Sequence, residues 1–462
     1  MMIIKEEKIL NDVGYKISSV LNSGNVVEHY VRCKAASVTV DNKLYLILFN
    51  RYFQVNVPVY EYINVYMSHM AKSEQTRRKT LVALKLLYSF LTIFNIKLED
   101  MTKNDTAKLM NFLLGNSVLG ESITLELSSM REANSVNDYL SVMRSYIKYL
   151  DIKKHPLLAN GGKKKLSNMS SYGEIHSTDS YEFRVKTRKN ENVAPKHITL
   201  DQYKVMLKHV QNIADKRLEC IIRLMYESGM RSGEVLGLTY EDLKQVEMTD
   251  GSNAYKVVGR SRITDKPWQS PKFLMKITDK VQYKLKRYRL KNDGYHDTYI
   301  NEDLYNLILE YIDEAHSKQQ VTHLDNWNKF SVTDSVDKEF GEEKNFYIFI
   351  NSVGRPYSNK LLYKDVKELF IICNVPVNED GGRKDGLCHR FRHGFAMFQV
   401  KYNSTPLLIL MELMHHSSVS STVIYYTPEE SDIIELKNEL TKNLYSYINE
   451  FSLSMEDNRW WR

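Results

Sequence analysis

The sequence of 462 residues predicts an α+β fold that is mainly helical, with a helical N-terminal domain and a larger C-terminal domain that holds a small antiparallel sheet. Apolar residues recur at helical spacing in residues 61–152 and again from residue 197 onward, and short β-type runs interrupt the second of these parts. A lysine-rich stretch without periodicity, residues 153–196, separates them and predicts an interdomain linker. A chain of this length has room for about two or three domains.

Residues 1–60 predict a small mixed region that contains a β-hairpin. In "ASVTVDNKLYLILF", residues 36–49, apolar side chains alternate on both sides of Asp41 and Asn42, a pair that favours a tight turn. The sequence of this region indicates no function.

Residues 61–152 predict a small helical bundle. The helix that carries its first apolar stripe opens with "TRRK", residues 76–79, where Arg77 and Arg78 oppose the helix dipole. Either this is a solvated helix end, or the two arginines contact phosphate groups. Two stripes at helical spacing define the core faces of the bundle: Leu84, Leu87, Tyr88 and Leu91, and further on Val136, Leu140, Met143 and Ile147.

The predicted linker, residues 153–196, is basic as well as irregular. A lysine-rich linker is often simply well solvated, but one that joins two basic domains could also cross a nucleic-acid backbone. The side chains that would make this second kind of contact are Lys153, Lys154, Lys163, Lys164, Lys165 and Arg188.

A second domain is predicted for residues 197–430, with a helical tail over 431–462. Thr199 and Gln202 have the spacing of a helix capping box, and the next helix should stop at Gly229 before another helix over 230–243. Residues 360–445 return to helical periodicity. Short strands are expected at "AYKVV" (254–258), "FLMKI" (273–277) and "FYIFI" (346–350), with "RSRITDKPWQSPK" (260–272) as the polar turn between the first two.

Composition bounds the class of protein. The formal net charge is +7, so the placement of basic residues matters more than their excess. The four cysteines include no C-x-x-C pair, which argues against a disulfide framework and a zinc site and favours a reduced, cytoplasmic protein. No run of 18 apolar residues predicts a membrane span, and the first residues reach acidic side chains too early for a signal peptide.

The segment "HRFRHGFAMF", residues 389–398, combines titratable and cationic side chains at the head of a helix. His389 and His393 have the i, i+4 spacing of helical zinc ligands, but Arg390 and Arg392 place permanent cations beside them and no third ligand is spaced nearby. We therefore expect no metal here.

As an anion site the same helix is more coherent. His389 and Arg392 share one face, which we expect to be exposed, while the phenylalanines cluster on the other face and predict core packing. An arginine offers a fork of donors for phosphate oxygens, and an adjacent imidazole can move a proton. His393 is then expected to be a structural histidine or one that supports a residue at the phosphate.

Two other segments carry suitable companions. In "SGMRSGEVLGLTYEDL", residues 228–243, Arg231 stands at the start of a helix, and Glu234 one turn later offers it a simple surface ion pair instead. In "HSSVSSTVIY", residues 416–425, a histidine precedes a serine cap and a tyrosine follows on the next helix.

In this order, R-S-G-E after G-M, then H-x-x-R-H, then H-S-S-x-S-S-T-x-I-Y, the motifs resemble those of the tyrosine recombinase (phage integrase) family. The resemblance covers residues 196–430 in detail. The helical region 61–152 matches the DNA-binding core-binding domain of the family more loosely. The C-terminal domain would then be the catalytic domain.

The resemblance implies a role for each motif residue. Arg231 and Arg392 would clamp the oxygens of the scissile DNA phosphate, and His416 would donate a hydrogen bond to it. His389 would assist proton transfer. Tyr425 would be the nucleophile that forms a 3′-phosphotyrosyl link, with its neighbour Tyr426 as the competing choice.

Some assignments stay open at this level. The family uses a lysine in a turn between two strands as general acid. We favour Lys266 for this role, and Lys272 stays possible because the register of the turn is open. The family usually has glycine where this chain has His415, so either His415 or His416 faces the phosphate. Arg390 is expected to face solvent or the DNA backbone. The C-terminal tail either docks on a neighbouring protomer or packs as a plain helix.

The implied function is site-specific recombination by an integrase or transposase of a mobile element, without metal or nucleotide cofactor. Its expected partners are double-stranded DNA with paired inverted-repeat sites, three further copies in a homotetramer at synapsis, and an accessory DNA-bending or directionality protein. The expected location is the cytoplasm, at the nucleoid. The alternatives are a catalytically silent DNA-binding regulator of the same fold and a type IB topoisomerase.

Overall fold

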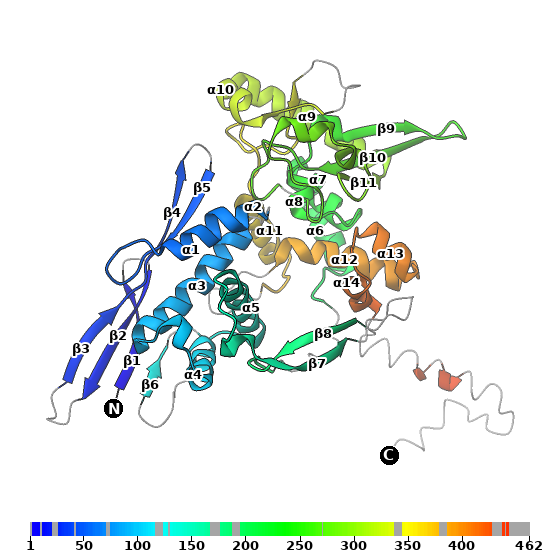
Figure 1. The fold of residues 1–462 in the computed structure, drawn as a ribbon. Coiled ribbons are helices and arrows are strands. Elements are labelled where there is room, and N and C mark those ends of the chain that lie inside the picture. Colours follow the sequence, from blue (N-terminus) through cyan, green and yellow to red (C-terminus); the bar gives the residue numbers. More distant parts are fainter. Residues whose placement is uncertain are drawn as a thin grey trace, which may run out of the picture. The chain divides into compact units, whose positions relative to one another are not determined.

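The computed structural model of the chain describes residues 2–9, 12–20, 26–40, 43–70, 74–115, 123–127, 130–166, 176–186, 195–269, 271–336, 344–377, 386–426, 437, 438 and 440–442. It divides into two compact units, Met1–Asn190 and Glu191–Arg462. Within the described residues, the predicted α+β, mainly helical fold with a small antiparallel sheet is confirmed (Figure 1).

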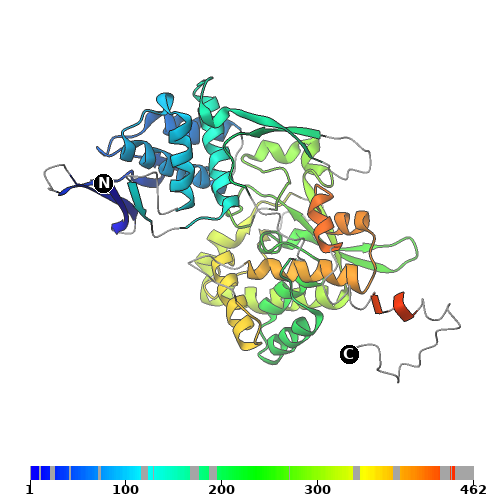
Figure 2. The same ribbon diagram turned by 90° about the horizontal axis from the view of Figure 1, so that it is seen from below.

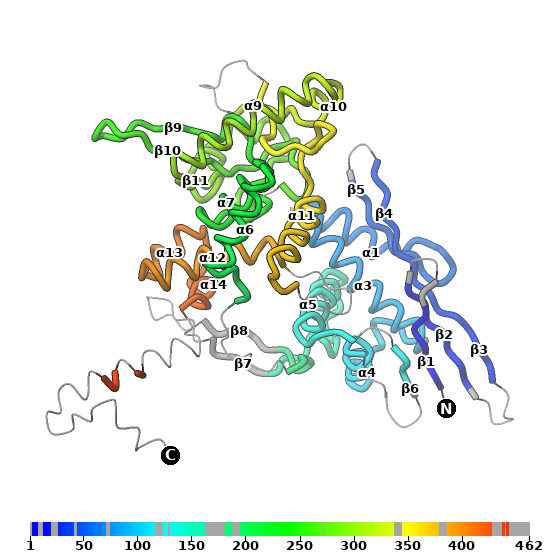
Figure 3. The backbone as a smooth tube through the Cα atoms, turned by 180° about the vertical axis from the view of Figure 1, so that it is seen from behind, coloured from blue at the N-terminus to red at the C-terminus, as the bar shows by residue number. Residues whose placement is uncertain are grey.

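A four-stranded sheet and a hairpin occupy the first part of unit 1. The strand order of the sheet is β3-β2-β1-β6, and β6 runs parallel to β1 although about 120 residues of chain separate them (Figure 3). The predicted hairpin is confirmed as β4 paired with β5. The strands are β1 (Met2–Ile9), β2 (Asp12–Val20), β3 (Val26–Val31), β4 (Ala35–Val40), β5 (Lys43–Leu48) and β6 (Ile123–Glu126).

The helices of unit 1 use the two predicted apolar stripes as core faces. Leu84 and Leu87 on α3, and Leu140 and Ile147 on α5, are fully buried. The same core cluster includes Ile4 and other strand residues, so residues 1–60 pack onto the bundle rather than forming a separate body. The helices are α1 (Val57–Glu61), α2 (Met67–His69), α3 (Glu74–Phe94), α4 (Lys103–Leu114) and α5 (Ala133–Tyr149), with a π-helical turn at Tyr62–Tyr66.

The predicted linker contains a hairpin that the sequence analysis missed. β7 (Asn160–Leu166) pairs antiparallel with β8 (His176–Tyr181). Both strands are polar, so they lack the period-two apolar signal by which a strand is recognised. Arg144 of α5 anchors the start of the hairpin, because its guanidinium lies 4.2 Å from the ring centroid of Tyr181 and its Nε donates to the carbonyl of Leu157 at 2.9 Å.

Unit 2 packs helices around a three-stranded antiparallel sheet of order β11-β10-β9. The predicted capping box is confirmed, with Gln202 and Thr199 exchanging hydrogen bonds at the start of α6. Its helices are α6 (Leu200–Asn212), α7 (Lys216–Tyr226), α8 (Ser232–Leu236), α9 (Glu302–Thr322), α10 (Leu324–Asn326), α11 (Asn359–Ile372), α12 (Leu387–Lys401), α13 (Leu407–Leu413) and α14 (Ser420–Val423); its strands are β9 (Leu243–Glu247), β10 (Asn253–Arg260), β11 (Tyr295–Ile300), β12 (Val332–Thr333) and β13 (Asn345–Phe346).

Helix α12, which carries the H-x-x-R-H motif, is packed tightly against α7 and α11 (orange in Figure 2). A Cβ atom on Gly394 would lie 2.5 Å from the carbonyl oxygen of Ile198 and 2.5 Å from the ring of Tyr226. Only glycine therefore permits this approach, which fixes the depth at which α12 sits in the unit.

Three predictions for unit 2 need correction. Residues 273–277 are not a strand: Phe273 has φ +69°, outside the extended region, and the sheet takes β9 and β11 as the partners of β10. Of residues 346–350, Phe346 ends the two-residue strand β13, and Tyr347 and Ile350 form isolated bridges. The helix expected over 230–243 is the short α8 followed by a 3-10 turn, Tyr240–Asp242.

The predicted C-terminal helix over 431–451 lies outside the described residues, except for residues 437, 438 and 440–442, which are helical. Among the helices that the structure describes, none combines the length and the apolar character needed to cross a membrane.

Candidate active site

Two arginines from distant segments meet where α7, α8 and α12 come together. Arg392 is 1% exposed, and its guanidinium donates to the backbone carbonyls of Gly229 and Met414. Gly229 ends the turn after α7 with φ +66°, as its position predicted, and Arg231 follows at the N-cap of α8. The expectation of an exposed face is therefore wrong for Arg392, which the neighbouring turns cover, and correct for His389, which is exposed.

Glu234 holds Arg231 in place. The Nη1 of Arg231 donates to Oε1 of Glu234 at 2.8 Å, and the backbone N–H of Arg231 donates to Oε2 at 2.8 Å. Both side chains are largely buried, at 11% and 3% exposure. The ion pair considered from the sequence thus exists, but it lies inside the site rather than on the surface.

The charges of this cluster influence one another. Burial, and after it the neighbouring charge of Arg231, lowers the pKa of Arg392 to about 10. Burial alone would raise the pKa of Glu234, but the two adjacent guanidinium groups hold it below its usual value. Glu234 is therefore an anion that offsets two nearby cations, which would otherwise repel each other in a poorly solvated place.

His389 lies close to these arginines in an uncharged state. Burial lowers its pKa to about 4, with Arg392 and Lys272 as the next largest causes. Its ring makes an edge contact with the ring of His393, with the centroids 4.3 Å apart. A neutral imidazole here can either accept or donate a hydrogen bond.

The two adjacent histidines 415 and 416 have different surroundings. His415 adopts φ +46°, the left-handed conformation that glycine takes without strain, and stacks on His296 with ring centroids 4.2 Å apart. His416 bonds through Nδ1 to the hydroxyl of Thr422 at 2.9 Å, and burial and then Arg392 lower its pKa to about 4. His415 thus leans toward the sheet and His416 toward the tyrosine segment.

Tyr425 points into this cluster. It lies on a 3-10 turn, Ile424–Tyr426, and is 3% exposed. Its hydroxyl is 2.7 Å from Nδ1 of His393. Burial raises its pKa to about 12, against the opposing effect of Arg392. Tyr426 instead donates its hydroxyl to the backbone carbonyl of Thr405, away from the arginines.

The two lysines considered for the general acid both lie on the long connection between β10 and β11. The backbone N–H of Lys266 donates to the side chain of Gln269 at 2.9 Å. Lys272 is exposed, and its charge is one of the groups that lower the pKa of His389. No such influence on the cluster accompanies Lys266 among the described interactions.

A buried ion network anchors this connection. The Nη2 of Arg262 donates to Glu241 and to Asp242, both at 2.7 Å, and all three side chains are fully buried. The backbone N–H of Arg262 also donates to Asp265 at 2.7 Å. The first residues of the connection are therefore fixed to the segment that follows α8.

One residue of the H-x-x-R-H helix lies elsewhere than expected, and a second makes a contact that the sequence did not predict. Arg390, expected at the surface, is 8% exposed, donates to the carbonyl of Pro376 at 2.7 Å and covers the ring of Phe370. His393, expected to be structural or to support a residue at the phosphate, contacts the hydroxyl of Tyr425. The i, i+4 spacing that suggested a metal pair was the signal that could have drawn attention to it. Phe391 and Phe395 are buried as predicted.

The basic side chains of unit 1 that were predicted to contact DNA differ in their exposure and in the protein groups that they bind. Arg77 donates to the carbonyl of Leu44 at 3.3 Å, and Arg78 pairs with Glu74 at 2.9 Å. Lys153 is 82% exposed, and Lys154 is exposed as well. Lys163, Lys164 and Lys165 belong to β7, whose side chains there are not described, and Arg188 lies outside the described residues.

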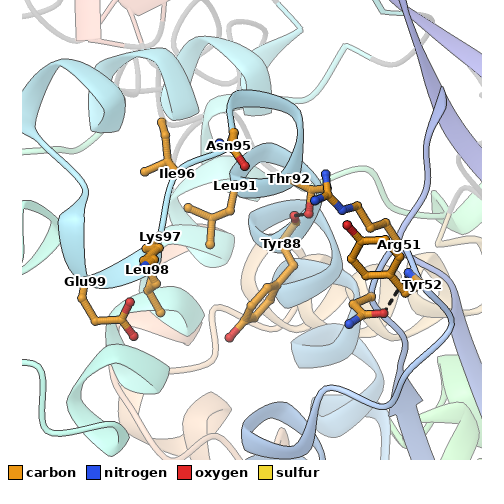
Figure 4. A pocket seen from close by; sticks show the side chains of 11 residues that line it. Arg51, Tyr52, Tyr88, Leu91, Thr92, Asn95, Ile96, Lys97, Leu98 and Glu99 are labelled. Atoms are coloured by element: carbon orange, nitrogen blue, oxygen red, sulfur yellow. Dashed lines mark hydrogen bonds between the residues drawn. The ribbon is translucent and has the colours of Figure 1, made fainter. Parts of the chain in front are cut away.

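Unit 1 also contains an open pocket of about 420 Å³ (Figure 4). The guanidinium of Arg51 lies 4.7 Å from the ring centroid of Tyr52 at one side, and Glu99 lies at the other. Its lining includes no residue of the arginine and histidine cluster. Across the described residues, no group of three or more His, Cys, Asp or Glu side chains could hold a metal ion.

Comparison with known proteins places the cluster in context. No protein-family model matches the chain. Transposase A from transposon Tn554 of Staphylococcus aureus is 29% identical over 218 residues, which are 46% of this chain and 58% of the transposase. Tyrosine recombinase XerD of Staphylococcus saprophyticus is 29% identical over 92 residues, 20% of this chain and 28% of XerD. The chain thus matches somewhat over half the length of the Tn554 transposase.

Solved structures with a similar course of the chain include the XerH site-specific recombinase bound to difH substrate and the Tn1549 transposon integrase in complex with transposon right-end DNA. The first is 16% identical and covers 79% of this chain and 78% of its own, with a TM-score of 0.46. The second is 14% identical, and the match covers 83% of this chain and 99% of the integrase chain, with a TM-score of 0.45.

Proposed function

Because the chain belongs to the tyrosine recombinase family, we propose that it is a site-specific DNA recombinase of a mobile element, an integrase or transposase, that cuts and rejoins DNA through a 3′-phosphotyrosyl intermediate. One observation carries the proposal. Arg231 and Arg392, 161 residues apart in sequence, share one buried cluster with the hydroxyl-bearing side chain of Tyr425.

In this proposal the two arginines bind the scissile phosphate. They lie close enough to depress the pKa of Arg392, so an anion between them relieves a repulsion that Glu234 only partly offsets. Guanidinium groups donate paired hydrogen bonds to phosphate oxygens, and charge on those oxygens grows as the phosphorus is attacked. His416 would add a further donor to the same phosphate.

Two protons must move during cleavage, one from the attacking phenol and one to the leaving 5′ oxygen. We propose Lys272 rather than Lys266 as the general acid, because its charge is felt by His389 inside the cluster. The arginines supply the cationic charge that a metal supplies in other phosphoryl-transfer enzymes, so we propose a metal-independent reaction. The phosphotyrosyl link conserves the phosphodiester bond energy, so rejoining needs no nucleotide cofactor.

The proposed substrate is double-stranded DNA with paired inverted-repeat sites, and a homotetramer would hold two such sites at synapsis. We also propose an accessory protein that bends the DNA or sets the direction of recombination. A relative that is a transposase supports a mobile element as the source of the sites. Such a protein would work in the cytoplasm at the nucleoid.

A catalytically silent DNA-binding regulator is the competing function from another class. Such a protein would have no use for a tyrosine hydroxyl buried beside two arginines. A type IB topoisomerase shares the chemistry but exchanges no strands. Scoring inversion or excision between two sites on one plasmid separates it from a recombinase.

The test of the proposed function uses a nicked suicide duplex that carries the terminal sequence of the mobile element. We expect the wild-type protein to form a covalent protein–DNA complex that resists denaturing electrophoresis. Tyr425→Phe should abolish this complex because it removes the nucleophilic oxygen, whereas Tyr426→Phe, which loses only a bond to the Thr405 carbonyl, should retain it. Trapping by Tyr425→Phe would refute the assignment of the nucleophile.

A further inference from the structure

We infer that His393 is the base that takes the phenolic proton of Tyr425 when that tyrosine attacks the DNA phosphate, an inference that rests on the proposed function. The resemblance to the family assigned proton transfer to His389, one turn earlier on the same helix. The geometry points to His393 instead.

The contacts around the hydroxyl carry this choice. Nδ1 of His393 lies 2.7 Å from Oη of Tyr425, within the range at which a proton can pass directly. The ring of His389 packs edge-on against His393, and Nδ1 of His416 is engaged by Thr422. Of these three histidines, His393 is the one whose hydrogen bond to Tyr425 is seen in the described part of the chain.

The protonation states agree with a hydrogen bond that the phenol donates to the imidazole. Burial, the largest cause, lowers the pKa of His393 to about 3, so the imidazole is neutral at physiological pH. A neutral imidazole with its proton on Nε2 accepts a hydrogen bond at Nδ1, and the phenol, whose pKa burial raises to about 12, donates it. The other titratable or charged groups that act on His393 are His389 and Arg392 on α12, His197 before α6, and His416 after α13.

The step balances as follows. The O–H bond of Tyr425 breaks and its proton goes to Nδ1 of His393, while the Oη–phosphorus bond forms. The bond from phosphorus to the 5′ oxygen breaks, and that oxygen takes a proton from the general acid. On rejoining, the 5′ hydroxyl attacks, the Oη–phosphorus bond breaks, and His393 returns its proton to the phenolate. The bound phosphate supplies the negative charge beside the transient imidazolium.

The decisive variant is His393→Gln, whose side-chain oxygen can still accept a hydrogen bond but cannot take the proton. Single-turnover cleavage of the suicide duplex would be measured between about pH 6 and pH 9. We expect the variant to be slower by about 100-fold or more near neutral pH. Its rate should rise about tenfold per pH unit, because only phenolate formed by hydroxide can attack, whereas the wild-type rate should stay nearly flat.

His197→Gln is the matched control. His197 also lies near His393 and depresses its pKa, but its own Nδ1 contacts the carbonyl of Pro195 at 3.1 Å and not the tyrosine. We expect this variant to keep the wild-type rate and the flat profile. Fluorescence anisotropy with the uncleaved duplex should give His393→Gln the affinity of wild type.

A second measurement needs no variant of His393. In the wild-type protein labelled with ¹⁵N-histidine, the signal of His393 can be identified by its shift in Tyr425→Phe. An unprotonated Nδ1 and a protonated Nε2 are expected near neutral pH. A protonated Nδ1 would overturn the inference even if His393→Gln failed to fold.

The outcomes of these experiments distinguish a failure of this inference from a failure of the proposed function. If the wild-type protein never forms a covalent complex with its DNA, the proposed function fails. If wild type cleaves and His393→Gln cleaves at the same rate with the same profile, the function stands and the role of His393 is wrong. A steep profile for His389→Gln, with a flat one for His393→Gln, would return the role to His389.

Discussion

At the residue scale, the side chain of Arg231 fits both interpretations that the sequence allowed. From sequence, Arg231 could form an ordinary ion pair or could clamp a phosphate. The structure has the ion pair, but both groups are buried, and Arg392 lies near enough to feel both charges. The carboxylate therefore prepares the cluster in the absence of DNA by offsetting two cations.

Glu234→Gln tests this account through stability. The change leaves two buried cations without their counter-charge, so the free energy of unfolding should fall by about 3 kcal/mol at neutral pH. Tryptophan fluorescence during urea unfolding reports on unit 2 alone, because the four tryptophans, 268, 327, 460 and 461, all belong to Glu191–Arg462.

The pH dependence gives this prediction its sign. The folded-state pKa of Glu234 lies below the ordinary value of 4.5, so the contribution of its charge to stability is complete above that pH and is lost as the pH falls through the folded-state pKa. The difference in the free energy of unfolding between wild type and Glu234→Gln should therefore become smaller in acid. The exposed carboxylate of Glu247 serves as control, since Glu247→Gln should change stability by less than about 0.5 kcal/mol. A difference that stays constant in acid would contradict the account.

Sequence could predict which residues of this site matter better than how they are arranged. Arg231, Arg392 and Tyr425 stand in short local motifs, so their identity was legible without any knowledge of the fold. The contact of His393 with Tyr425 depends on how a 3-10 turn 32 residues later packs on α12, and the burial of Arg390 depends on α11. Such contacts between distant segments leave no periodic trace in the sequence.

At the scale of elements, the connection between β10 and β11 is where prediction from sequence failed most clearly. A β-type run at residues 273–277 predicted a strand, yet Phe273 takes a left-handed conformation and is 67% exposed. Tertiary contacts override the local preference there, since Arg262 ties the connection to Glu241 and Asp242 in the interior. The register of the lysines could therefore not be read from a strand–turn–strand pattern.

Lys272→Met tests which lysine this connection delivers to the leaving group. Cleavage of ordinary DNA should slow by about 100-fold, because the departing 5′ oxygen lacks its proton. A duplex with sulfur in place of the bridging 5′ oxygen should restore the rate to within a few-fold of wild type, since a thiolate leaves without protonation. Lys266→Met should cleave both duplexes like wild type. Sulfur rescue of Lys266→Met instead would reverse the assignment.

At the scale of the whole chain, local patterns predicted the helical character of residues 61–152, the helices α6, α7, α11 and α12, and the hairpin β4–β5, but not α9. They could not predict the sheet of unit 1, because β6 joins β1 from a point far along the sequence. They also could not predict the polar hairpin β7–β8, whose strands occupy Asn160–Leu166 and His176–Tyr181 of the expected linker. Basic side chains that seemed equivalent in sequence consequently differ in their freedom to meet DNA.

That difference leads to a prediction about binding. If both units contact DNA phosphates, the affinity for the uncleaved duplex should fall by about 10³-fold or more between roughly 50 and 200 mM salt, because bound counterions are released. Lys153 and Lys154 are exposed, and Lys153 lies 4.0 Å from a carboxylate oxygen of Asp151, whereas Lys103 is held more closely by Glu182, at 2.9 Å. Replacing Lys153 and Lys154 by alanine should lower the slope of log affinity against log salt by about 2, and Lys103→Ala should leave it unchanged. Anisotropy titrations over a salt series measure these slopes, and an affinity independent of salt would contradict DNA as the partner.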